Sequence, residues 1–449
     1  NGIGHFGGVA GHSTGYVDSS TVSGLALTAT NANVQISTQE TETTLPNFKI
    51  YSDAAILIDS NTGKIICGKD IHKKVYPASV TKILTAIIAI ENCELTDMLT
   101  ASRDAVMSIP SGYSNAGIKA NESISFKDLL DMFLIHSANE IGYIFAEHVS
   151  GTVEQFATLM NEKTKELGCL NTHFTNPSGI HDPEHYTTAY DMALIAKYCM
   201  KNETFRNTVS KQSCTVEATD KYEERYFKNT NDLLNPSSKY YYEYAIGTKT
   251  GYTSQAKRCL IASSSKNNIE LITVVLGTQS STPDNRYLDT INLFEYGFSN
   301  YEFKQIATKN TVIEEILVGN ATKDTQNLSL LLKNDISGLI PVNINSTNLK
   351  PTIELNNLIA APIEKGSVLG KITYNIDGTE YSSDLIASHS VEEFNPVTLL
   401  SQIALALFIL FIMGKLLFKQ KKSKKRSSKN KKSGNKKYKK SSDSIYKFK

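Results

Sequence analysis

The sequence of 449 residues predicts an α+β fold, in which an antiparallel sheet with helices packed around it is followed by a small all-β domain and a C-terminal transmembrane helix. Three observations predict it: strand patterns flank a series of helical patterns, short alternating strands follow, and an unbroken apolar stretch comes near the end. The parts are a disordered leader, a first domain, a β-domain, a transmembrane helix and a basic tail, at 1–45, 46–300, 301–392, 397–418 and 419–449.

The leader is predicted from its abundance of Gly, Ser, Thr and Asn, a composition that buries too little apolar surface to fold. The first domain then begins with two strand patterns, at 54–59 and 64–67. The turn residues Ser-Asn-Thr-Gly stand between them, so we expect a β-hairpin.

The next element is a buried helix that we expect to begin at Ser79. Residues 76–82 read YPASVTK and open the apolar run 83–90. Positions i and i+3 share one face of a helix, so the Lys82 amine should lie beside the Ser79 hydroxyl, with first-turn N–H groups pointing to the same spot. A nucleophile, a base and an anion-stabilising dipole would then converge. Taken alone, the pattern fits an N-capping serine and a surface lysine better.

Further elements follow in an order that predicts the sheet. Apolar residues at helical spacing recur at 126–136, 141–149, 153–167 and 188–200. Strand patterns return at 245–252, 258–263 and 269–276, before a last helical pattern at 286–296. A hairpin, helices, a meander and a helix predict an antiparallel sheet covered by helices.

The stretch 397–418 is predicted to cross a membrane. At ~1.5 Å per residue it extends ~33 Å, enough for a hydrocarbon layer of ~30 Å, and Lys415 can snorkel to the interface. An amphipathic helix lying in the interface fits less well, because no polar face recurs after Gln402.

Charge is divided unevenly along the chain. The net charge is +2, yet 16 of the 47 basic residues and one of the 45 acidic residues lie from Lys415 onward, so the part before it carries about −13. The positive-inside rule predicts a single-pass protein of the cell membrane, with a cytoplasmic tail and residues 1–396 extracellular. The acidic body argues against nucleic-acid binding.

Three short motifs follow one another in the first domain: Ser79-x-x-Lys82, Ser137-x-Asn139 and Lys249-Thr250-Gly251. Together they resemble the active-site set of the penicillin-binding proteins and class A β-lactamases. Similarity over about residues 48–392 narrows this resemblance to the low-molecular-weight D-alanyl-D-alanine carboxypeptidases. The segments that carry it are 160–161, 167–168, 172–179, 187–193 and 229–234.

The resemblance implies a serine peptidase that removes the terminal D-alanine from peptidoglycan pentapeptide stems in cell-wall biogenesis. Ser79 would attack the carbonyl of the penultimate D-Ala to form an acyl-enzyme, and Lys82 would act as base. Ser137 would relay a proton to the leaving D-Ala. Asn139 would hold Lys82 and the substrate amide.

Substrate binding is expected on the strand motif. Lys249 and Thr250 of the Lys-Thr-Gly251 motif would bind the terminal carboxylate. Arg286 is a weaker candidate for the same anion and suits a structural ion pair about equally well. The N–H groups of Tyr252 and of the nucleophile would form the oxyanion hole.

No metal and no cofactor is expected. His181, Asp182, Glu184 and His185 resemble ligands, but Pro183 prevents a helical H-x-x-x-H face, so a loop with structural hydrogen bonds is favoured over zinc. The six cysteines lack C-x-x-C spacing and favour neither a metal site nor a dense disulfide framework. The expected partners are the D-Ala-D-Ala stem peptide, β-lactams that acylate the nucleophile, and the membrane through 397–418.

Three alternatives remain: a β-lactamase, a DD-endopeptidase of the same superfamily, and a non-catalytic wall-binding protein. A β-lactamase needs a carboxylate for its deacylating water. Residues 166–171 nearly copy the E-x-x-L-N pattern but are one residue too long and begin inside a predicted helix. The chain also has Ala256-Lys257-Arg258 where the family usually has Ala-Gly, so two cations near the cleft mouth would alter substrate preference or sit in solvent.

Overall fold

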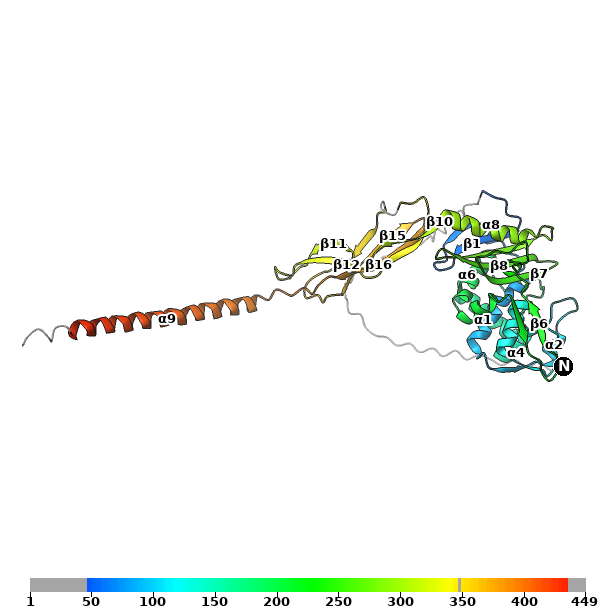
Figure 1. Cartoon of the computed structure of the whole chain (residues 1–449), viewed down its shortest axis with the longest axis horizontal. Coiled ribbons are helices and arrows are strands. Elements are labelled where there is room, and N and C mark those ends of the chain that lie inside the picture. The colour runs from blue at the N-terminus through cyan, green and yellow to red at the C-terminus, as the bar shows by residue number, and fades with distance from the viewer. Residues whose placement is uncertain (1–46, 346–348, 435–449) are drawn as a thin grey trace, which may run out of the picture. The chain divides into compact units, whose positions relative to one another are not determined.

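The computed structural model describes residues 47–345 and 349–434 (Figure 1). The predicted leader, residues 1–45, and the last part of the predicted tail lie outside these ranges. The first domain contains an antiparallel sheet with the strand order β2-β1-β9-β8-β7. Its strands are β1 Ala54–Asp59, β2 Ile65–Lys69, β7 Ala245–Thr253, β8 Lys257–Lys266 and β9 Ile269–Thr278.

Both faces of this sheet are covered by helices. Ile56 and Ile58 of β1 pack in one apolar cluster with α1 Lys82–Asn92 and α6 Ala189–Met200. Leu57 points to the opposite face, where it packs with α8 Asn285–Asn300. Figure 1 shows α8 on one side of the strands and α1 with α6 on the other. The predicted α+β layering is therefore confirmed.

The remaining helices build a second layer next to α1. Several begin at a side chain that accepts a backbone N–H, as at Ser125, Thr152 and Thr188. The predicted helix 126–136 is present, but its last turn is π-helical. The bounds are α2 Arg103–Met107, α3 Phe126–Asp131, the π turn η2 Met132–His136, α4 Glu140–Ser150, α5 Val153–Glu166 and α7 Glu203–Val209.

Several short elements had no clear periodic signal in the sequence. They are the strand pair β3 Met98–Thr100 with β4 Ser123–Ser125, the hairpin β5 Ser213–Val216 with β6 Arg225–Lys228, and the 3₁₀ turn η3 Asp232–Leu234. The turn places residues 230–232 beside β7.

The β-domain has its own apolar core, which includes Leu328, Leu330 and Leu332 from alternate positions of one strand. Its larger sheet has the order β11-β12-β16-β15-β14, and β10 pairs with β13. The bounds are β10 Tyr301–Ala307, β11 Val312–Leu317, β12 Asn327–Leu332, β13 Ile336–Pro341, β14 Thr352–Leu355, β15 Val368–Ile376 and β16 Thr379–Ala387.

The last element is α9 Pro396–Gly434. Its part Pro396–Lys421 is long and apolar enough to cross a membrane. The helix extends past the predicted end at 418, because lysine is a good helix former and no Pro or Gly interrupts residues 419–432.

Candidate active site

Ser79 lies in a 3₁₀ turn, η1 Ala78–Thr81, and Lys82 is the first residue of α1. The sequence predicted one continuous helix from Ser79. Gly179 allows this turn to lie close to its own backbone, because an added Cβ at Gly179 would lie 1.9 Å from the carbonyl oxygen of Ala78. Gly179 also has φ of +78°, so no other residue fits without displacing this turn. Ser79 remains half-buried at the surface of a cavity, and Lys82 is fully buried beneath it.

The Lys82 amine is surrounded by three oxygens. Its Nζ lies 2.7 Å from Oδ1 of Asn139, 2.6 Å from the carbonyl oxygen of Ser178 and 3.0 Å from Oγ of Ser79. Burial, and next the charge of Lys249, lowers the pKa of Lys82 well below its usual value, which favours the neutral amine. A neutral amine has two hydrogens, and the first two oxygens are the available acceptors. Its lone pair is then left for the Ser79 hydroxyl.

Ser137 and Asn139 follow the π turn. Ser137 adopts a left-handed conformation, with φ of +72°, which ends η2 and turns the chain into α4. The Nδ2 group of Asn139 donates to the carbonyl oxygen of Ser114 at 2.7 Å, so its Oδ1 faces Lys82. Ser114 donates in turn to the carbonyl oxygen of His136 at 3.1 Å. These bonds fasten one wall of the cavity to the residues that hold the amine.

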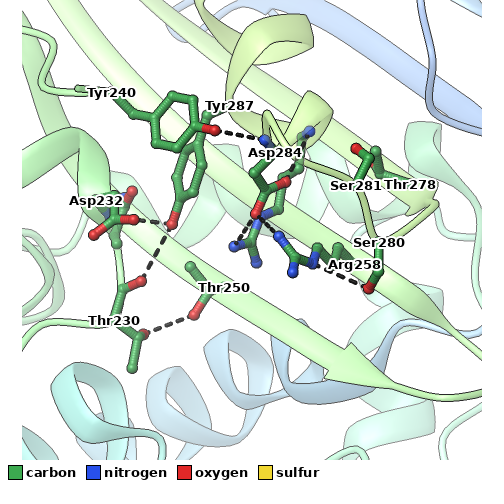
Figure 2. Close-up of polar contacts among 12 residues, drawn as sticks. Thr230, Asp232, Tyr240, Thr250, Arg258, Thr278, Ser280, Ser281, Asp284 and Tyr287 are labelled. Carbon is green, nitrogen blue, oxygen red and sulfur yellow. Dashed lines mark hydrogen bonds and ion pairs between the residues drawn. The ribbon is translucent and has the colours of Figure 1, made fainter. Parts of the chain in front are cut away.

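The strand motif lies on β7, the last strand in its sheet, so one edge of β7 has no strand partner among residues 47–345 and 349–434. An added Cβ at Gly251 would lie 3.1 Å from the backbone nitrogen of Ser79, so glycine allows β7 to approach the nucleophile. Tyr252 follows and is 60% exposed. The hydroxyls of Thr250 and Thr230 lie 2.6 Å apart, as Figure 2 shows.

Lys249 is buried, with 1% of its surface exposed. Its amine donates to the carbonyl oxygen of Thr250 at 3.0 Å. Burial, and next the charge of Arg286, lowers the pKa of Lys249 to about 7. The sequence predicted that Lys249 binds the terminal carboxylate. Its amine lies under the cavity surface, and that role stays a prediction.

Arg286 reaches the cavity from the first turn of α8. Its Nη2 donates to Oδ2 of Asp284 at 3.0 Å and its guanidinium lies over the ring of Tyr287. Arg286 therefore forms the ion pair that the sequence allowed and also lines the cavity, and its binding of a carboxylate stays a prediction.

The cavity has a volume of about 530 Å³. Seven of the nine predicted site residues line it, and Lys82 and Lys249 lie beneath. The sequence missed the wall formed by residues 111–114, where no periodic pattern is present, and it missed Thr230, although Thr230 lies in one of the segments that resemble the family. The full lining is Ser79, Ser111, Gly112, Tyr113, Ser114, His136, Ser137, Asn139, Thr230, Thr250, Gly251, Tyr252, Thr253, Ser254 and Arg286.

The two unusual cations are both paired. Lys257 donates to Asp53 at 2.7 Å, and Arg258 donates to Asp284 and to Ser280. Both side chains remain about 30% exposed, so they are in contact with solvent but ion-paired. Glu166, which suggested a β-lactamase, lies at the end of α5, where it faces Lys163 and lines no part of the cavity.

The ligand-like loop forms structural hydrogen bonds, as expected. Nδ1 of His185 accepts from the N–H of Thr175 at 3.1 Å, so Nε2 donates to the hydroxyl of Thr81 at 2.9 Å. All six cysteines are free thiols. Elsewhere in the described part of the chain, the ligand atoms of Cys93, Asp97 and His148 lie within 4.8 Å of one another, a group outside the cavity that the sequence did not suggest.

Comparison with known proteins agrees with the geometry. The family described as D-alanyl-D-alanine carboxypeptidase matches residues 38–280, and the family described as the C-terminal domain of penicillin-binding protein 5 matches residues 301–393. The D-alanyl-D-alanine carboxypeptidase DacF of Bacillus subtilis is 33% identical over 341 residues, which cover 75% of this chain and 84% of that protein. DacA of Haemophilus influenzae is 31% identical over 359 residues, covering 78% and 86%.

Solved structures give the same assignment. Penicillin-binding protein 5 from Haemophilus influenzae superposes with a TM-score of 0.64 at 30% identity, over 78% of this chain and 100% of that one. The resemblance stated from the three motifs is thereby confirmed. The chain belongs to the D-alanyl-D-alanine carboxypeptidase family of serine peptidases.

Proposed function

We propose that this chain removes the terminal D-alanine from peptidoglycan stem peptides, with Ser79 as nucleophile and Lys82 as base. The observation that carries the proposal is the set of contacts around Lys82. Two fixed acceptors would occupy the hydrogens of the neutral amine and leave its lone pair for the Ser79 hydroxyl, whose Oγ lies 3.0 Å from Nζ. A positioned base of this kind contributes about 10²–10⁴-fold to a rate.

In the first step the Ser79 proton passes to Lys82 while Oγ bonds to the carbonyl carbon of the penultimate D-Ala. The C–N bond then breaks, and Ser137, which lines the same cavity, passes its proton to the leaving amine and regains one from Lys82. Water then gives a proton to Lys82 as its oxygen bonds to the acyl carbon, the bond to Oγ breaks, and Lys82 returns that proton to Ser79. The N–H groups of Ser79 and Tyr252 would stabilise the oxyanion, at about 3 kcal/mol for each donor.

The free edge of β7 offers backbone groups to an extended peptide, which would bind as an added strand. Its terminal carboxylate would lie near Thr250, Thr230 and Arg286, which all line the cavity, with the two threonine hydroxyls 2.6 Å apart. Gly251 keeps this strand close to the nucleophile. Lys249 contributes charge from below, without direct contact at the cavity surface.

The C-terminal apolar helix would anchor the chain in the cell membrane. With the basic residues after it in the cytoplasm, the catalytic domain would be extracellular, on the side where peptidoglycan lies. Protease protection in vesicles of known orientation tests this topology.

The test of the activity is release of D-alanine from a pentapeptide ending in D-Ala-D-Ala by the full chain in detergent. We expect release by the wild type and none by Ser79→Ala. Benzylpenicillin should leave a lasting adduct on Ser79, seen by mass spectrometry. No release by the wild type would favour a wall-binding protein, and rapid turnover of benzylpenicillin would favour a β-lactamase.

A further inference from the structure

Asp284 accepts hydrogen bonds from two guanidinium groups at once. It precedes α8, where its Oδ1 accepts from the N–H of Arg286 at 3.1 Å and caps the helix. Its Oδ2 accepts from Nη2 of Arg286 at 3.0 Å and from Nη1 of Arg258. Figure 2 shows Arg258 and Asp284 pointing toward each other. One negative charge is therefore shared between two permanent positive charges.

The two guanidinium groups occupy different places. Arg286 lines the catalytic cavity, its side chain is 12% exposed, and its buried Nε has no hydrogen-bond partner in the described part of the chain. Arg258 comes from β8, lies outside the cavity lining, and is held by Ser280 at 3.2 Å. Arg286 can therefore contact a ligand in the cavity, whereas Arg258 contacts Asp284 outside the cavity lining.

The pairing of Asp284 with both arginines determines how much positive charge a bound ligand meets at Arg286. A carboxylate paired with Arg286 alone would cancel most of its field at a bound ligand. A second cation on the same carboxylate leaves these three side chains with a net charge of +1, which offsets the further negative charge that Asp232 places near Arg286. Lys249 does not replace this charge, because it is buried and partly neutral at pH 7. The permanent charge at this end of the cavity therefore depends on both arginines.

We propose that Arg258 determines specificity for a free C-terminal carboxylate, because it shares Asp284 with Arg286 and leaves part of the Arg286 charge for the substrate. The inference rests on the proposed function, in which that carboxylate is the end of the stem peptide. Arg258 acts through Asp284, so it is a positioning residue. One of the two cations that set this sequence apart thereby receives a role in substrate preference.

The experiment uses the full chain in detergent and two peptides, a pentapeptide ending in D-Ala-D-Ala and the same peptide with a C-terminal amide. For Arg258→Gln we expect the KM of the free-acid peptide to rise roughly fivefold to tenfold, with kcat within about twofold. The amide peptide, measured as a competitive inhibitor, should change its inhibition constant by less than about twofold, since it has no terminal charge.

The matched control is Lys257→Gln. It removes the same charge one residue away, but Lys257 pairs with Asp53 and not with Asp284. We expect no change in either peptide's affinity. The double variant Arg258→Gln with Asp284→Asn should return the KM toward the wild-type value, because the carboxylate that would neutralise Arg286 is gone and asparagine still caps α8.

A merely structural role for Arg258 would weaken both peptides equally and would not be rescued by the second substitution. An unchanged KM in Arg258→Gln, or an equal rise in Lys257→Gln, overturns the inference while the proposed function stands. A wild-type chain that releases no D-alanine overturns both.

Discussion

The two sides of the cleft each contain a fully buried lysine, and their surroundings differ. Three oxygens lie within 3.0 Å of the Lys82 amine, whereas among the described residues the Lys249 amine has one acceptor, the carbonyl oxygen of Thr250. Burial lowers the pKa of both amines. Burial alone therefore does not distinguish a base from a buried cation; the acceptors do.

On the Lys82 side, fixed acceptors orient a lone pair toward the nucleophile. On the Lys249 side, an always-charged guanidinium stands at the cavity surface and is tied to Asp284. Proton transfer is thus assigned to Lys82 and anion binding to Arg286. Substitutions on each side of the cleft should therefore change different steps of the reaction.

The largest effect is expected for Lys82→Met, which keeps most of the length of the side chain but removes its basic amine. Acylation of Ser79 should slow by about 10³-fold or more, because the hydroxyl has no other base within hydrogen-bond distance among the described residues. The measurement is the rate of the benzylpenicillin adduct by mass spectrometry, with thermal melting to confirm folding. A folded variant that acylates within tenfold of the wild type would contradict the role of Lys82.

A smaller effect is expected for Asn139→Ala. The amine loses one of its two acceptors and can turn its lone pair away, and the wall at Ser114 loses its amide contact. We expect a loss of about 10²-fold in kcat/KM for the pentapeptide. Ser114→Ala is the control, because the carbonyl that accepts from Asn139 remains; it should stay within about twofold. Equal losses in the two variants would show that the activity depends on the cavity wall at Ser114 and not on the orientation of the Lys82 amine.

Site residues that are close along the chain could be placed together from the sequence, whereas contacts between distant segments could not. Ser79 and Lys82 are one turn apart, so local geometry places them together, and the alternation of apolar residues places the strands. The left-handed Ser137 and the π turn before it gave no signal, because apolar spacing over 126–136 is equally consistent with a regular α-helix.

Contacts between distant segments were not visible. The pairing of Lys257 with Asp53 joins β8 to the residue before β1, and the sharing of Asp284 by two arginines needs the end of β9 to return beside β8. The sequence therefore identified these cations as unusual but left them in solvent or at the cleft mouth. The lowered pKa of Lys249 could not be predicted from the sequence either, because it depends on burial and on the charge of Arg286.

The smallest effect expected is a pH dependence of substrate affinity on the Lys249 side. The pKa of Lys249 is about 7, lowered by burial and next by Arg286, so Lys249 loses its charge as the pH rises through 7. The KM of the free-acid peptide should therefore rise a few-fold between about pH 6 and pH 8.

The control is Arg286→Gln, which removes the positive charge beside Lys249 and so raises the pKa of Lys249. The same rise in KM, from a higher starting value, should then occur at higher pH. A midpoint that stays in place in this variant would show that some group other than Lys249 titrates, and the charge of Lys249 would then have no part in anion binding beside Arg286.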